Sequence, residues 1–356
     1  MYEIAKRSDL TTSMWNKEAD NSPDAWLWHR WESIDAYASW AHSKDISFAV
    51  LEKTSGRVAA LVPLIRHTRG SKIPYPQVRI EGTGGPAFVK TLGVDQRKRV
   101  EAHIARKIQK LAANQGAYRV DLSSPPLSPS NLSSNQNYST SFRGLGFSDV
   151  STQSWLLQLH GKTKEELWKG MEYRSRKSVN KALRAGVSTR PIQLQDEKIF
   201  LRLLTENTKR TGISAKPATY YEQIFRNFLP AGLAKGYCAY TDTNNIHSIH
   251  IFGVYKGGAI YWVVASDHYA LSVGANNLLQ WSAICDLADN GLCWYESGEA
   301  FPNEQNGKVR RISDFKKSFG GALVPYHRGT LRCRPFVAAT YDCMRVLRKN
   351  LQHVKR

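Results

Sequence analysis

Two adjacent lysines between aromatic residues are the first candidates for chemistry in this sequence. In the segment SDFKKSFGG (313–321), Lys316 and Lys317 lie between Phe315 and Phe319, and two consecutive glycines follow. An ammonium group can neutralise an anionic partner, and glycine adopts backbone conformations that strain other residues. Taken alone, the pattern predicts a basic patch beside a tight turn.

A glycine-containing turn before a helix is a second candidate. The stretch YWVVASDHYALSVGANNLLQW (261–281) predicts a strand, a polar loop and a helix that begins at Asn276 or Asn277. Backbone N–H groups at a helix start bind anions, and glycine lets a phosphate approach closely. The candidate phosphate-binding residues are Ser272, Gly274, Asn276 and Asn277, with a plain turn as the alternative.

A basic stripe is expected on a long helix over 162–187. A helical advance of about 100° per residue gathers its cations in one sector, opposite an apolar sector. The cations are Arg174, Lys177, Lys181 and Arg184, and the apolar residues are Met171, Val179 and Ala182. The stripe suits a polyanion, and ordinary solvated surface is the alternative.

The composition as a whole is basic. Fifty Lys and Arg against 30 Asp and Glu give a net charge of +20 and an isoelectric point near 9.8. This balance favours RNA, a phosphorylated cofactor or an anionic membrane surface as partner, and a merely soluble basic surface is the alternative. From Arg328 onward the chain holds many cations and one acid, Asp342, which suits phosphates or anionic lipid headgroups.

Several chemistries find no support in the sequence. It has no nucleophile elbow, Walker loop, HExxH motif or Rossmann glycine fingerprint. The five cysteines form no CxxC pair and no zinc-spaced cluster, so we expect reduced, mostly buried thiols, no metal site and a cytoplasmic protein. We find no signal peptide and no membrane-spanning stretch, so we expect any membrane contact to be peripheral.

We expect two domains, because 356 residues exceed what one core usually fills. The predicted domains are 1–150 and 151–356, and a Pro/Ser-rich loop at 123–141 marks the region of the boundary. In the first domain we expect a core helix at 24–31, a hairpin at 46–67, a helix at 94–117 and a strand at 118–122. In the second we expect strands at 153–159, 235–242, 246–257, 258–267 and 292–297, and helices at 162–187, 197–212, 218–229 and 276–291.

The order of these elements and their motifs resembles the FemAB-like proteins, which share the GNAT acyltransferase fold. The matching motifs are YRSRKSVNKALRAGV, RTG, IYWVVAS, GANNLLQWSAICDLADNG, WYESGEA and DFKKSFGG, all within residues 155–329. FAVLEKTSGRVAALVPLI in the first half is similar to the family's N-terminal GNAT-like unit. The resemblance implies an α/β (α+β) fold of two tandem GNAT-like domains, with mixed sheets flanked by helices, and amide-forming acyl transfer.

The resemblance also implies roles for individual residues. Phe315 and Lys316 match the family's FK pair, whose lysine is implicated at the acceptor end of the donor. A fixed ammonium there would stabilise the oxyanion that forms when an amine attacks an ester or thioester. Glu296 and Glu299 are candidate proton acceptors, with structural hydrogen bonding as the alternative.

Other residues are candidates for binding. Phe319, together with Phe315, could form dry walls or stack on a terminal adenine, and Lys317 could face a donor phosphate. The further donor-side residues are Ser272, Gly274, Asn276, Asn277, Arg174, Lys177 and Lys181. The acceptor-side residues are His250, Tyr261 and Ser266, with a structural role for His250 and His247 as the alternative.

These observations together predict an aminoacyltransferase. It would move an amino acid from aminoacyl-tRNA to an amine of a cell-wall precursor or peptide-like metabolite, in the cytoplasm or at the inner membrane face, with no tightly bound cofactor. The first alternative is an acyl-CoA-dependent N-acyltransferase acting on an amino sugar or amino acid, although the full Q/R-x-x-G-x-G/A phosphate loop is missing. The second alternative is a non-catalytic RNA- or membrane-binding module of the same fold.

Overall fold

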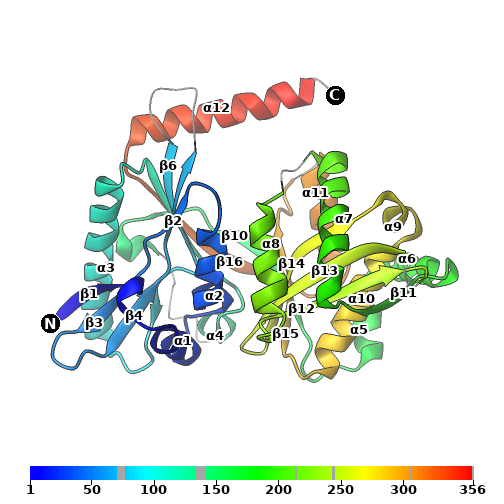
Figure 1. The fold of residues 1–356 in the computed structure, drawn as a ribbon, viewed down its shortest axis with the longest axis horizontal. Helices are drawn as coiled ribbons and strands as arrows, with labels where there is room; N and C mark the ends of the chain where they lie inside the picture. The colour runs from blue at the N-terminus through cyan, green and yellow to red at the C-terminus, as the bar shows by residue number, and fades with distance from the viewer. Residues whose placement is uncertain (70–76, 134–141, 213–214, 243–244, 305–306, 355–356) are drawn as a thin grey trace. The chain divides into compact units, whose positions relative to one another are not determined.

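The protein forms two compact units, seen in a computed structural model (Figure 1). The structure describes residues 1–69, 77–133, 142–212, 215–242, 245–304 and 307–354. The first unit comprises Met1–Pro125, Ser133–Ser151 and His327–Arg356, and the second comprises Pro126–Leu132 and Thr152–Tyr326. The passage from Ser151 to Thr152 lies one residue from the boundary expected at 150/151, but Pro126–Leu132 belong to the second unit and the chain returns to the first unit from His327 onward.

The first unit contains two sheets. One consists of β1 (Tyr2–Lys6), β3 (Phe48–Glu52), β4 (Val58–Val62) and β7 (Ala87–Phe88), antiparallel and in that order. The other consists of β2 (Ser43–Asp45), β5 (Ile65–Arg69), β6 (Gln77–Thr83), β8 (Arg119–Ser124) and the part of β16 (Ala322–Arg332) from His327 onward, with β9 (Ser148–Asp149) beside β16. Only β6 and β8 pair in parallel among these described strands.

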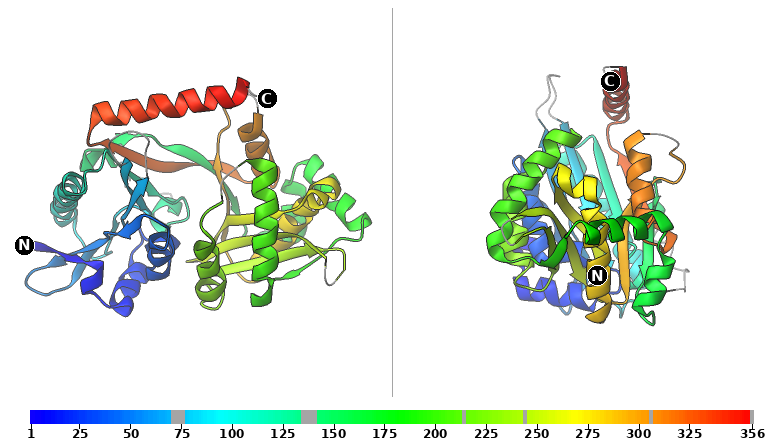
Figure 2. Two further views of the ribbon diagram at one scale, coloured as in Figure 1. Left: turned by 45° about the horizontal axis from the view of Figure 1, so that its top comes forward. Right: turned by 90° about the vertical axis from the view of Figure 1, so that its right-hand side faces the viewer.

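Helices cover these sheets. They are α1 (Thr12–Asn21), α2 (Trp31–Ala38) and α3 (Val94–Asn114). A further helix, α12 (Pro335–Val354), follows β16 (Figure 2). The periodicity of α3 is confirmed, since Val100, Ile104 and Ile108 are fully buried and Gly116 adopts a left-handed conformation after the helix ends. The hairpin of β3 and β4 is also confirmed.

The tryptophan-rich segment at 24–31 is not the expected helix. It contains a short 3₁₀ turn, Leu27–His29, and α2 begins only at Trp31. The expected packing holds nonetheless, because Trp26 and Trp28 are buried and their rings meet edge to face at 5.6 Å. Apolar content alone could not separate a helix from a tightly packed turn.

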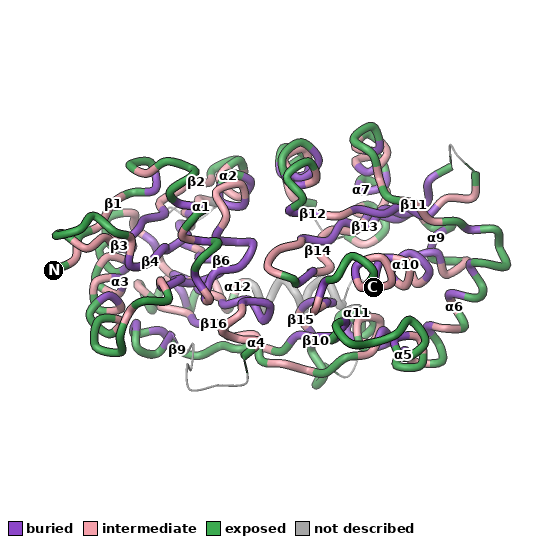
Figure 3. Tube along the Cα trace, turned by 90° about the horizontal axis from the view of Figure 1, so that it is seen from below, coloured by how far each residue is buried: buried purple, intermediate pink, exposed green. Residues whose placement is uncertain are grey.

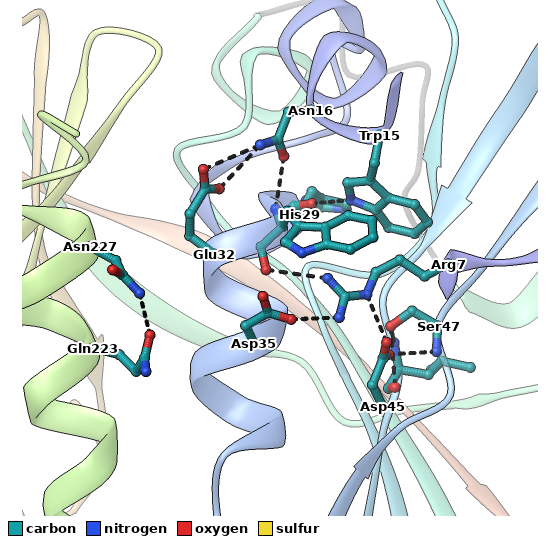
Figure 4. A network of polar contacts seen from close by, with 12 residues as sticks. Arg7, Trp15, Asn16, His29, Glu32, Asp35, Asp45, Ser47, Gln223 and Asn227 are labelled. Atoms are coloured by element: carbon teal, nitrogen blue, oxygen red, sulfur yellow. Dashed lines mark hydrogen bonds and ion pairs between the residues drawn. The ribbon is translucent and has the colours of Figure 1, made fainter. Parts of the chain in front are cut away.

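Arg7, in the first turn of this unit, forms hydrogen bonds to strand β2 and to helix α2 (Figure 4). The Arg7 guanidinium donates to Asp45 at 2.7 Å and to Asp35 at 2.6 Å, and it stacks on the Trp31 ring at 3.8 Å. Asn16 on α1 accepts a hydrogen bond from the Trp31 N–H at 2.8 Å. The buried charge is therefore paired from two elements, which fits a structural role.

The second unit is built on one mixed sheet in the order β11-β12-β13-β14-β15-β10-β16. Its strands are β10 (Thr152–Gln158), β11 (Ser188–Pro191), β12 (Ala234–Tyr240), β13 (Ile246–Tyr255), β14 (Gly258–Ser266), β15 (Trp294–Ala300) and the part of β16 up to Tyr326. Among these described strands only β14 and β15 are parallel. β13 is buried along most of its length (Figure 3), as expected for a central strand.

The helices of this unit begin and end as follows. They are α4 (Pro129–Leu132), α5 (Lys164–Gly170), α6 (Tyr173–Arg184), α7 (Glu197–Thr211), α8 (Ala218–Gln223), α9 (His268–Val273), α10 (Ala275–Asp289) and α11 (Gly307–Lys317). A π-helical turn, Ile224–Phe228, continues α8. The Pro/Ser-rich loop expected at 123–141 is described to residue 133, and its remainder lies outside the described residues.

Two predicted elements of this unit are wrong in detail. The helix expected over 162–187 is divided into α5 and α6, because Met171 and Glu172 are extended and the Glu172 N–H bonds the Ser318 carbonyl at 2.9 Å. Arg176 caps the end of α5 by donating to the carbonyls of Lys169 and Met171. The polar loop expected before Gly274 is the helix α9, which Asp267 caps at the Ala270 N–H at 2.8 Å.

In the described part of the chain no helix is long and apolar enough to cross a membrane. No group of three His, Cys, Asp or Glu residues within that part is arranged to hold a metal ion. The cysteines form no disulfide, and Cys343 is exposed, whereas Cys238 is buried.

The glycine turn between α11 and β16 gives a stability prediction. Gly321 has φ +93°, and a Cβ there would lie 2.4 Å from the Leu156 carbonyl oxygen. Gly321→Ala should therefore lower the free energy of unfolding by at least about 2 kcal/mol in urea denaturation. The matched control is Gly161→Ala, where φ is +76° but no atom lies within 4 Å. Equal losses in both variants would contradict the packing argument.

Candidate active site

The parallel strands β14 and β15 separate soon after their pairing begins. β14 and β15 pair at three positions, the last being Ile260 with Glu296. Farther along, β15 continues its pairing with β10, and no described strand pairs with that edge of β14. The side chains of β14 from Tyr261 to Val264 are accordingly partly exposed. Divergence of two parallel strands leaves room for a ligand between them.

Unsatisfied polar groups gather on β15 at this point. Three consecutive residues each carry a buried oxygen without a hydrogen-bond partner, namely Tyr295 Oη, Glu296 Oε2 and Ser297 Oγ. Buried polar atoms are almost always paired in folded proteins, and exceptions call for a functional or structural reason. The cluster marks the start of the opening as a candidate active site.

Lys316 reaches this site from the end of α11. Its Nζ donates to the Glu299 carbonyl at 2.6 Å. Gly298 makes room for it, since a Cβ there would lie 3.0 Å from Nζ. Burial lowers the pKa of Lys316, and the carboxyl groups of Glu296 and Glu299 oppose this shift. The structure thus brings Lys316 together with both predicted glutamates.

The two glutamates are held differently. Glu296 is 1% exposed and its Oε1 accepts a hydrogen bond from Ser154 Oγ at 2.6 Å. Burial raises the pKa of Glu296 to about 7, while Ser154 and Lys316 oppose the shift. Glu299 is partly exposed, and its Oε1 accepts from Thr152 Oγ1 at 2.7 Å. Glu296 is therefore the better candidate for proton transfer near neutral pH.

The phenylalanines and the second lysine of the motif have separate surroundings. Phe315 and Phe319 meet edge to face at 5.1 Å, and Phe319 is fully buried in the core of the second unit. Their packing on each other and on this core holds the end of α11 in place. Lys317 is 56% exposed and its Nζ lies 3.9 Å from Glu172. Successive lysines thus face different environments.

The predicted phosphate loop packs against α6. Gly274 has φ +83°, and a Cβ there would lie 2.7 Å from the Ser178 carbonyl oxygen. Lys181 Nζ donates to the Ser272 carbonyl at 2.6 Å, and Asn277 donates to Ser175 at 3.2 Å. The close approach of this turn to α6 is therefore sufficient to explain why position 274 is a glycine.

The basic stripe on α6 is exposed, as its sequence period predicts. Arg174 is paired with Glu172 at 2.8 Å and donates to the Asp314 carbonyl at 2.6 Å. Lys177 and Arg184 are exposed and make no ion pair with any described residue. The stripe keeps part of its positive charge uncompensated.

Comparison with known proteins shows similarity to a family over part of the chain and to solved structures over most of it. Residues 137–248 match the model of the FemAB family. The structure is similar to the crystal structure of FemX, with a TM-score of 0.65 and 14% identity over 91% of this chain and 96% of that chain. Residues 137–248 of this chain are therefore similar to the FemAB family, and the fold of the chain is similar to that of FemX.

Other solved structures share the fold of this chain. A tandem GNAT protein from the clavulanic acid biosynthesis pathway matches with a TM-score of 0.55 and 12% identity over 94% of this chain and 99% of that chain. The C-terminal domain of a putative lysylphosphatidylglycerol synthetase from Agrobacterium fabrum matches with a TM-score of 0.55 and 12% identity over 92% and 95%. No curated protein matches the sequence. The predicted GNAT-like fold is confirmed.

The acceptor-side residues predicted for the FemAB-like chain do not gather at its opening. His250 is fully buried, its Nδ1 pairs with Gln280 Oε1 at 3.2 Å, and burial lowers its pKa to about 4. Ser266 is buried and accepts from Asn276 at 3.4 Å. Tyr261, whose pKa is raised by burial, is partly exposed on the open edge of β14. Of the three, only Tyr261 reaches that edge.

Sequence reasoning missed two hydroxyl groups of the candidate site. Thr152 and Ser154 on β10 hold the two glutamates of β15 from the neighbouring strand. Thr152 and Ser154 are two positions apart, which puts both side chains on one face of a strand. This spacing was the signal in the sequence that could have identified them. Their partners depend on the antiparallel register of strands that are far apart in the sequence.

Proposed function

We propose that this FemAB-like acyltransferase moves an aminoacyl group from aminoacyl-tRNA to an amine of a cell-wall precursor or a lipid-linked acceptor. The observation that carries the proposal is the Lys316 ammonium beside the buried Glu296 carboxyl at the opening of β14 and β15. This pair combines an anion-stabilising cation with a carboxyl group that titrates near neutral pH.

The residues would act on the reaction as follows. The acceptor amine attacks the ester carbonyl, so that a C–N bond forms and an oxyanion develops. Lys316 Nζ stabilises that oxyanion, and Glu296 takes the proton from the amine. When the C–O ester bond breaks, the same proton passes to the departing ribose oxygen. The products are an amide and uncharged tRNA.

Two further features favour RNA as the donor over acyl-CoA. The net charge of +20 and the exposed cations of α6 suit a polyanion larger than a single cofactor. Packing of Gly274 against the Ser178 carbonyl, which a Cβ would approach to 2.7 Å, accounts for this glycine without a phosphate. A domain of a putative lysylphosphatidylglycerol synthetase, which is similar in fold, is named for a product that joins an aminoacyl group to a lipid, and this supports an aminoacyl donor and a lipid acceptor.

A donor assay tests the proposal. Purified protein is incubated with a pool of labelled aminoacyl-tRNA and a peptidoglycan precursor or aminolipid, and in parallel with acyl-CoAs. We expect a labelled product that survives mild base, as an amide does and an ester does not, and that does not form when the tRNA pool is treated with RNase before the protein is added. Thiol release from acyl-CoA without RNA would support the CoA alternative. Binding of tRNA without turnover of either donor would support the non-catalytic alternative.

A further inference from the structure

A pocket lies beside β11, the edge strand of the second unit's sheet (Figure 1). Its volume is about 500 Å³, which is within the range of small-molecule sites in proteins. It is lined by the segment that follows β11, by the start of β12 and by the end of α10, which packs against β12. Because β13 lies between β12 and β14, this pocket is separate from the opening beside β14.

Apolar side chains form much of the pocket wall. They belong to Ile192, Leu194, Leu229 and Pro230. Leu194 is 58% exposed, and Ile192 and Leu229 are partly exposed. The Ile192 side chain lies over Gly236, where a Cβ would collide with it. An apolar wall of this kind is typical of a site that receives the apolar part of a ligand.

An oriented carboxylate forms the polar part of the pocket. Asp286 Oδ2 accepts hydrogen bonds from Tyr237 Oη at 2.5 Å and from Asn290 Nδ2 at 3.1 Å. Lys235 Nζ donates to the same oxygen at 3.3 Å. Burial and the neighbouring carboxylate raise the pKa of Tyr237 well above its usual value, so its hydroxyl remains a donor. Asp286 is therefore held in one position before any ligand binds.

The two charged groups of this pocket keep unused hydrogen-bonding capacity. Asp286 is 41% exposed at its side chain, and its Oδ1 accepts no hydrogen bond from any described residue. Lys235 is 32% exposed at its side chain and donates one side-chain hydrogen bond within the described part of the chain. An ammonium can donate three. A negative and a positive group thus face the same pocket, only a few ångströms apart.

We propose that this pocket binds a free α-amino acid with a large apolar side chain. The ammonium of the ligand would meet Asp286 Oδ1, and its carboxylate would meet Lys235 Nζ. Its side chain would lie on Ile192 and Leu194. The 3.3 Å between Lys235 Nζ and Asp286 Oδ2 favours a ligand whose two charges are on one carbon over a dipeptide, whose charged ends are farther apart. This site does not rest on the acyl-transfer proposal.

Calorimetric titration of the full chain tests the pocket with L-leucine as the probe. Three analogues each lack one part of leucine: 4-methylpentanoate has no ammonium, 3-methylbutylamine has no carboxylate and glycine has no apolar side chain. We expect saturable binding of leucine and binding about tenfold weaker or worse for each analogue, because each leaves a charged or apolar group of the pocket unmatched. Leucyl-leucine should also bind more weakly than leucine.

Matched variants assign the binding to this pocket. Lys235→Met keeps the side-chain length, removes the ammonium and should weaken leucine binding about tenfold or more. Its control is Lys164→Met, because Lys164 pairs with Asp289 at 2.7 Å and does not line the pocket. Leu194→Ser should also weaken binding, whereas Leu183→Ser, at a leucine 55% exposed on α6, should not. Thermal melts check that each variant is folded.

Three outcomes would overturn the proposal. They are wild-type protein that shows no saturable leucine binding at millimolar concentrations, leucine binding that Lys235→Met leaves unchanged, and an analogue without one charge that binds as tightly as leucine. Lys316→Met separates this pocket from the candidate active site and should bind leucine as the wild type does. Leucine binding lost in Lys316→Met and kept in Lys235→Met would place the ligand at the candidate active site instead. The donor assay uses none of the pocket residues, so either proposal can fail alone.

Discussion

Replacing Lys316 with methionine is expected to lower kcat about 10²- to 10³-fold while KM for the donor changes little. Lys316 Nζ is held at 2.6 Å from the Glu299 carbonyl, so the ammonium is positioned before the substrate arrives. A preorganised cation acts on charge that develops only in the transition state, which is why its loss appears in kcat. Methionine keeps the length of the side chain and removes the charge. Single-turnover transfer from charged tRNA measures the effect.

The fold should tolerate this substitution. Burial already lowers the pKa of Lys316, which means that the charged form is disfavoured at this position. The melting temperature of Lys316→Met should therefore stay at or above that of the wild type. Lys317→Met is the matched comparison, because Lys317 is 56% exposed and should affect KM for a polyanionic donor and leave kcat near its wild-type value. A Lys316→Met variant with kcat within about threefold of wild type would remove Lys316 from the mechanism.

Local pattern was sufficient for much of the fold. Helix α3 and the hairpin of β3 and β4 follow from periodicity and turn residues, since each buries one face against a nearby partner. The lysine motif was also recognised from sequence. In the structure, α11 ends at Lys317 and a glycine turn leads into β16. These features depend on contacts within a few residues.

Features that depend on distant contacts were not predicted. The helix expected over 162–187 breaks at Met171 and Glu172, where the backbone bonds Ser318 far along the chain. The return of the chain to the first unit through β16 depends on pairing with β8. The difference between Glu296 and Glu299 depends on which hydroxyl of β10 each one meets. Sequence supplied the residue types of the site, and the sheet register decides their roles.

Replacing Glu296 with glutamine is expected to change both activity and the pH dependence of stability. Glu296 has an ordinary pKa of 4.5, and burial raises this to about 7 in the folded protein. Between these values the folded state binds more protons than the unfolded state, so stability falls as pH rises and the full loss is present above pH 7. The difference between the two pKa values of Glu296 corresponds to about 3 kcal/mol in the free energy of unfolding. Relative to wild type, Glu296→Gln should therefore gain about that much stability between pH 5 and pH 8, as measured by urea unfolding.

The same substitution should remove the proton acceptor. Glutamine can still accept the hydrogen bond from Ser154 Oγ, so the site keeps its shape, but it cannot take the proton of the attacking amine. We expect kcat to fall about 10²-fold or more and the acid limb of the pH–rate profile near pH 7 to disappear. The gain in stability and the loss of activity would then have one cause, a carboxylate kept in the core for its function.

Glu299→Gln is the matched control for this prediction. Its side chain is partly exposed and bonded to Thr152, and it lies on the same strand beside the same lysine. The control should keep the acid limb and show no gain in stability between pH 5 and pH 8. A limb that persists in Glu296→Gln, or one that vanishes in Glu299→Gln instead, would transfer the proton-accepting role away from Glu296. A missing stability gain in Glu296→Gln would show that the buried carboxyl is not the group that couples folding to pH in this range.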